Sequence, residues 1–278
     1  MSETHGPERA AGGQPQPADG GRFRAAEWLL RLITTLTYGL LYAPVLVTVL
    51  FSFNAPRGRF NLQWQGFTLE HWLHPLRDGA LSRAFATSVA LALAAAAIAT
   101  VLGALMALAL ARFRLGAQRW IGLLLVLPLT NPEIVLAASL LHLFALAGVG
   151  RGLLTLLLSH SLFCLSYAAL TVKARLGGWD PQLEEAALDL GARPLEVFRR
   201  VTLPLLAPGL LAAALLSFSL SFDDYVISVF TAGEVVTLPL YIAGAMQREI
   251  SPQIQVLSTL VLLVSAACLA LGLRQEQG

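Results

Sequence analysis

Long hydrophobic stretches separated by polar segments dominate the pattern of the chain. A helix that crosses a bilayer needs about 20 mostly apolar residues. Six stretches meet this requirement: residues 28–53, 85–111, 120–146, 153–172, 204–230 and 256–273. Their apolar runs are continuous and rich in Ala and Leu, whereas strands of a membrane barrel alternate apolar and polar residues. The pattern predicts an all-α membrane protein with about six transmembrane helices.

Composition supports a membrane environment. Hydrophobic residues make up 56% of the 278 residues and charged residues only 13%, against about 25% charged in a typical soluble domain. A net charge of +2 without a dense basic run gives no reason to expect a nucleic acid partner. Residues 1–27 begin with a segment rich in Gly, Pro, Gln and Ala, and we expect them to form a disordered tail.

The distribution of basic residues predicts the orientation. If the N-terminus is inside, 13 of the 19 Lys and Arg residues lie in segments that face the cytoplasm. Cytoplasmic segments of membrane proteins carry an excess of Lys and Arg. We therefore expect both termini in the cytoplasm, the 54–84 connection outside and the loop between the fourth and fifth stretches inside.

That inside loop has the pattern of a helical hairpin. Asp180 is a good N-cap, Pro181 suits the first helical position, and Gly191 is a left-handed helix stop. A second short helix is predicted over residues 194–201. An apolar stripe along the first helix suits docking on a partner, although an ordinary amphipathic surface loop explains it equally well. The stripe consists of Leu183, Ala186, Ala187 and Leu190.

The same loop resembles the EAA loop of ABC importer permeases. The shared pattern is Glu-Ala-Ala, three residues, Gly, nine residues, an aliphatic residue, one residue and Leu-Pro. Here these positions are Glu185, Ala186, Ala187, Gly191, Val201, Leu203 and Pro204. The resemblance, which extends over roughly residues 28–273, implies the type I ABC importer permease fold. It also implies a first transmembrane helix at 28–53, a periplasmic connection at 54–84, and a permease core at 85–273 in the bacterial inner membrane.

The resemblance further implies that the loop at 179–204 couples the permease to an ATPase. Lys173 is the only lysine in the chain and follows a valine, so the chain has no P-loop for nucleotide phosphates. We expect no cofactor in this chain, with ATP and magnesium bound by a dimer of separate ATPase subunits. A second homologous permease, a periplasmic solute-binding protein and the lipid bilayer are the other implied partners. The chain shows no ordered nucleophile and base, so it is predicted to be a transport subunit and not an enzyme.

Acidic residues within the hydrophobic stretches are candidates for a substrate path. A carboxylate at the bilayer centre costs about 2.5–3.5 kcal/mol on insertion scales, so it generally faces a cavity or a partner. Asp223 and Asp224 lie in the fifth stretch, next to Tyr225, and Glu133 lies in the third. These residues suit a cationic solute, with Tyr225 adding a cation–π contact. The alternative is a structural role, and adjacent helical residues point about 100° apart, so the two aspartates face one pore only if the helix is distorted.

The identity of the solute rests on the resemblance. Within the family, the chain is most similar to permeases for the polyamines spermidine and putrescine, which bring solute inward by alternating access. The same machinery for a phosphonate, an opine or ferric ion remains an alternative, and an ion-coupled secondary transporter is a more distant one. His142 and His160 are each interpreted as a hydrogen-bond donor to a neighbouring helix and not as part of a proton relay. His71 and His74 have metal-like spacing without a third ligand nearby, so no metal site is predicted.

Overall fold

A computed structural model describes residues 20–58, 60–113, 116, 118–178, 180, 182–248 and 251–263 of the chain. This part of the chain is helical apart from its connections and one isolated bridge between Asn54 and Phe67. Four helices are long and apolar enough to cross a membrane, and a bent pair raises the number to five. The all-α membrane prediction is confirmed at this level.

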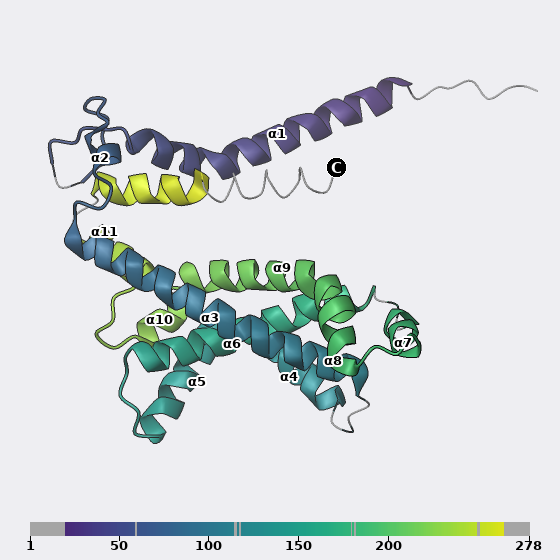
Figure 1. Cartoon of the computed structure of the whole chain (residues 1–278). Coiled ribbons are helices and arrows are strands. Elements are labelled where there is room, and N and C mark those ends of the chain that lie inside the picture. Colours follow the sequence, from purple (N-terminus) through teal and green to yellow (C-terminus); the bar gives the residue numbers. More distant parts are fainter. Residues whose placement is uncertain are drawn as a thin grey trace, which may run out of the picture.

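The N-terminal helix α1 (Gly20–Phe51) stands apart from the central bundle (Figure 1). It begins eight residues earlier than the predicted span, because Arg, Ala and Glu after the Gly pair propagate a helix readily. Residues 1–19 of the predicted tail lie outside the described part. None of the most apolar window of α1 is buried, so its side chains face lipid or another subunit.

Three helices form the centre of the bundle: α3 (Gly79–Arg112), α6 (Leu153–Leu176) and α9 (Leu203–Phe222) (Figure 1). Small residues let these helices approach closely, as is common where helices pack within membranes. A Cβ atom on Gly103 of α3 would come within 2.7 Å of the backbone nitrogen of Ala169 in α6. The buried core to which they contribute is correspondingly rich in alanine: Ala99, Ala104, Ala107, Ala168 and Ala213.

The third predicted span is broken into α4 (Gln118–Thr130) and α5 (Glu133–Leu146), and the chain bends by 111° between them. Pro132 has no N–H group to donate and disfavours a helical conformation at Asn131. The fifth predicted span is likewise divided, into α9 and α10 (Val226–Thr231), with residues 223–225 between them. Helix α10 packs against α5, which brings the two breaks close together.

The remaining elements lie around the bundle. Helix α2 (Glu70–Leu73) lies in the 54–84 connection, where the Phe53 ring stacks on Trp72 at 5.0 Å. Helix α11 (Leu238–Met246) was not predicted, because it is too short to span; it packs on α3. The last predicted span is represented by a helix at Pro252–Leu263, and its remainder lies outside the described residues.

The hairpin between α6 and α9 differs from the prediction in its second arm. Helix α7 (Gln182–Asp189) is followed by α8 (Pro194–Val197), a π-helical turn η1 (Phe198–Thr202) and α9, and the last three form one continuous stretch, Pro194–Phe222. The sequence suggested a helix ending before Pro204. Proline cannot donate to the preceding turn and crowds it, and the wider π turn before Pro204 accommodates the ring without ending the helix.

Candidate functional site

The break between α9 and α10 separates the two adjacent aspartates. Asp223 follows the last residue of α9, and its backbone N–H still donates to the Ser219 carbonyl at 3.3 Å. The Asp224 carboxylate turns the other way and accepts hydrogen bonds from the backbone N–H groups of Ile227 and Ser228, at 3.3 and 3.0 Å. Asp224 thereby satisfies amides at the start of α10, whereas Asp223 is exposed in this chain.

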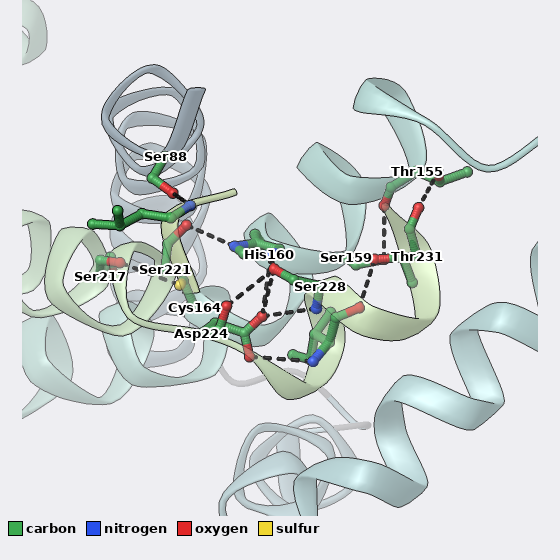
Figure 2. A network of polar contacts seen from close by, with 12 residues as sticks. Ser88, Thr155, Ser159, His160, Cys164, Ser217, Ser221, Asp224, Ser228 and Thr231 are labelled. Atoms are coloured by element: carbon green, nitrogen blue, oxygen red, sulfur yellow. Dashed lines mark hydrogen bonds and ion pairs between the residues drawn. The ribbon is translucent and has the colours of Figure 1, made fainter. Parts of the chain in front are cut away.

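Asp224 belongs to a buried polar network with His160 of α6 (Figure 2). Nε2 of His160 lies 3.2 Å from Oδ2 of Asp224, and both side chains are only 1% exposed. Nδ1 of the same ring lies 2.8 Å from the Ser221 hydroxyl, and the Ser228 hydroxyl donates to Asp224 at 3.1 Å. Since a carboxylate only accepts, Nε2 carries a proton toward it. The interpretation of His160 as a hydrogen-bonding residue between helices is confirmed.

Asp223 and Tyr225 line a different space. A cavity of about 460 Å³ lies between the end of α9, α11 and the Pro252–Leu263 helix. Asp223 supplies a carboxylate to an otherwise largely apolar wall, and Tyr225, a residue that is 46% exposed, contributes to the same wall. Further wall residues are Phe222, Leu238, Ile242, Met246 and Leu257. One carboxylate on an apolar wall fits an organic cation with a hydrocarbon backbone.

Glu133 lies at the other break, as the first residue of α5. It lies near Asp224 and Asp223, because α5 packs against α10, which directly follows the second break. The structure therefore brings together the three acids that the sequence singled out. They differ in their surroundings: Asp224 is enclosed, Glu133 is half-buried and Asp223 is exposed. His160 pairs with one of these acids, Asp224. This pairing was not predicted, because the sequence does not show which helix faces α6.

In the hairpin between α6 and α9, the first arm has the predicted caps. Asp180 accepts from the backbone N–H of Gln182 at 3.0 Å, whereas Pro181 lies outside the described residues. Gly191 has φ +86°, which confirms the left-handed stop. The backbone N–H groups of Gly191 and Ala192 donate to Leu188 and Ala187 at 2.9 and 3.2 Å. These two hydrogen bonds form a Schellman motif, which ends a helix sharply.

The outer face of α7 has no covering within the described chain. Leu183 is 50% exposed and Leu190 is 89% exposed, and Glu185 and Ala186 are also exposed, whereas Ala187 is half-buried. The other positions of the EAA pattern lie in the second arm, with Val201 in η1 and Leu203 and Pro204 at the start of α9. An exposed apolar face on a rigidly capped helix suits a groove on a partner protein.

The positions of the described side chains give no support for a metal site. Within the described residues, no three His, Cys, Asp or Glu side chains are grouped to hold a metal ion.

Comparison with known proteins shows the family. Residues 99–274 match the model of the "Binding-protein-dependent transport system inner membrane component" family. The chain is 37% identical to the spermidine/putrescine transport system permease protein PotC of Haemophilus influenzae, over 85% of this chain and 92% of that protein. It is 38% identical to the putrescine transport system permease protein PotI of Escherichia coli, over 83% and 84% of the two chains.

Solved structures agree on the fold. A chain of a bacterial ABC transporter for import of the acidic polysaccharide alginate matches with a TM-score of 0.66 at 16% identity, covering 94% of this chain and 99% of that one. A chain of an amino acid ABC transporter matches with a TM-score of 0.56 at 16% identity, over 75% of this chain. The described helices therefore have the arrangement of an ABC importer permease. With its family model matched over most of the chain, the protein belongs to the binding-protein-dependent transport system inner membrane components, the permease subunits of ABC importers.

Proposed function

We propose that this permease imports polyamines of the spermidine and putrescine class. The similarity to PotC and PotI over most of the chain supports this substrate. The single structural observation that carries the proposal is the cavity beside Asp223, where a carboxylate meets a largely apolar wall. An alkyl polyamine presents the complementary chemistry, since ammonium groups pair with the carboxylate and methylene groups contact the wall.

Among the candidate residues, Asp223, Tyr225 and Glu133 form the substrate path in this proposal. Asp223 and Tyr225 line the cavity, and Glu133 lies at the neighbouring break, only half-buried. Asp224 has a different task, because its carboxylate is engaged by His160 and by the amides of α10. It acts on the path indirectly by holding the start of α10 against α6.

The hairpin made of α7 and α8 is the coupling element. The seven EAA-pattern residues and the exposed outer face of α7 support contact with the ATPase dimer, which binds ATP and magnesium. Both termini face the cytoplasm in this arrangement. Residues 54–84 face the periplasm, and the core at 85–273 pairs with a second homologous permease and receives solute from the binding protein. Nucleotide binding stabilises one of two conformations, which gives alternating access.

Uptake by the reconstituted complex tests this function. Proteoliposomes that contain both permeases and the ATPase, with binding protein added outside, are expected to accumulate labelled spermidine or putrescine only when ATP is inside. Competition with a phosphonate, an opine and ferric ion identifies the solute class. ATP-dependent uptake of one of these instead of a polyamine would overturn the proposed substrate, and uptake driven by an ion gradient without ATP would overturn the coupling.

A further inference from the structure

A polar cluster fastens the hairpin to the end of a central helix. Arg112 is the last residue of α3, and its guanidinium donates to Oε1 of Glu184 in α7. The Thr202 hydroxyl donates to the same oxygen from η1, and Nη2 of Arg112 lies 3.4 Å from that hydroxyl. One carboxylate oxygen therefore joins both arms of the hairpin to α3, which is far from them in sequence.

The surroundings of the cluster favour a fixed geometry. Thr202 is fully buried, and the side chains of Glu184 and Arg112 are 21% and 43% exposed. Charge-assisted hydrogen bonds are roughly twice as strong as neutral ones, and partial burial limits their screening by salt. The end of α3 is held further by Gln118, whose side-chain amide donates to the Leu110 carbonyl at 2.9 Å.

Glu184 and Glu185 are adjacent but have opposite environments. Glu184 points toward the bundle and is half-buried, whereas Glu185 is exposed with the outer face of α7. Helix α7 packs on α8 and η1, which continue into α9. A displacement of α7 thus reaches α9 along the helix backbone. The contact of Glu184 with Arg112 adds a second route, because it connects α7 directly to α3.

We propose that Arg112, Glu184 and Thr202 form a clamp that makes the coupling hairpin move together with α3 as well as α9. The three are positioning residues, and the inference rests on the hairpin being the coupling element. Without the clamp, α7 swings on its connection to α6, which contains Gly177 and Gly178, and part of the displacement is lost before it reaches the bundle. Movement of α3 together with α9 carries the displacement to the end of α9, where Asp223 lines the cavity.

The first test measures transport for each ATP hydrolysed in the reconstituted complex. Glu184→Gln and Arg112→Gln are expected to lower solute uptake per ATP by at least ~5-fold, the lower end of typical coupling between sites, while the ATPase still co-purifies. The charge-exchanged double variant, Arg112→Glu with Glu184→Arg, is expected to recover part of the loss. Glu70→Gln is the matched control, because Glu70 forms an exposed ion pair with Arg77 outside the hairpin; its ratio should stay at the wild-type value.

The second test does not depend on the solute. Spin labels at Ala111→Cys and Gln182→Cys, in a background without the native cysteines, report the separation between the end of α3 and α7. The clamp predicts one narrow separation with and without a non-hydrolysable ATP analogue, and a broader one after Thr202→Val or Glu184→Gln. A wild-type separation that changes with nucleotide, or a Glu184→Gln variant with normal uptake per ATP, would overturn the clamp. Failure of the wild-type complex to import polyamines would overturn the substrate proposal alone.

Discussion

The same substitution is expected to have different effects at the two adjacent aspartates. At Asp223 it should lower uptake, and at Asp224 it should lower stability. Asp223→Asn removes a charge from the cavity but leaves the backbone contacts of α9 in place. A charge-assisted hydrogen bond contributes about 1.5–3 kcal/mol, so uptake of a polyamine at subsaturating concentration should fall roughly 10- to 150-fold. The stability of the complex should stay close to that of the wild type, because Asp223 is exposed and forms no ion pair with a described residue.

Asp224→Asn is expected to act on stability first. It removes the negative charge opposite His160, with both side chains 1% exposed. Breaking a buried pair by changing one partner typically costs about 3–5 kcal/mol. At roughly 2–4 °C per kcal/mol for a chain of this size, the midpoint of thermal unfolding should fall by roughly 6–20 °C. An Asn amide oxygen in the place of Oδ2 retains the contacts with the Ser228 N–H group, the Ser228 hydroxyl and His160, so the fall should lie toward the lower end.

The assay pair is thermal unfolding of the purified complex in lipid nanodiscs and initial uptake rates in proteoliposomes. His160→Asn is the matched control for the buried pair: it should lower the unfolding midpoint as Asp224→Asn does. If Asp224→Asn lost uptake at unchanged stability, or Asp223→Asn unfolded the complex, the division of roles between the two acids would be wrong.

Three further outcomes follow from local geometry. Gly103→Val should prevent assembly, measured by co-purification of the subunits, because a side chain there collides with the Ala168 and Ala169 backbone. Gly191→Ala should weaken the hairpin by about 1 kcal/mol, seen as faster proteolysis of the loop, since φ is +86°. Tyr241→Phe should make the complex more acid-labile, because the hydrogen bond from Tyr241 is the largest cause that lowers the pKa of Asp78. The stabilisation by ionised Asp78 is present above its unfolded pKa and is lost as pH falls through the lowered folded value, so unfolding below about pH 4 should shift upward in pH.

Much of the helix arrangement was predictable, because a bilayer leaves few alternatives to apolar helices of sufficient length. The two breaks were only partly predictable. Pro132 indicated a kink between α4 and α5, but the 111° bend depends on how α5 packs against α10. The pair of aspartates indicated a polar site in the fifth span, yet the division of that span at residues 223–225 follows from Asp224 capping α10.

The partners of the acidic residues were beyond the sequence. His160 and Asp224 are 64 residues apart by their numbering, and no periodicity within either helix shows that they face each other. The same holds for Arg112 and Glu184. From the sequence alone they look like ordinary charged surface residues, one at a helix end and one in a loop. Local signals were more reliable: the caps formed by Asp180 and Gly191 depend on neighbouring backbone groups, so they could be predicted.

The uninterrupted helix from Pro194 to Phe222 gives the molecule a lever arm. Its 29 residues span roughly 43 Å at a rise of about 1.5 Å per residue. If the arm pivots near the hairpin, a tilt of ~10° displaces the far end by ~7 Å. That end carries Asp223, so under the proposed coupling a small rotation at the hairpin becomes, at the carboxylate, a displacement larger than an ammonium group.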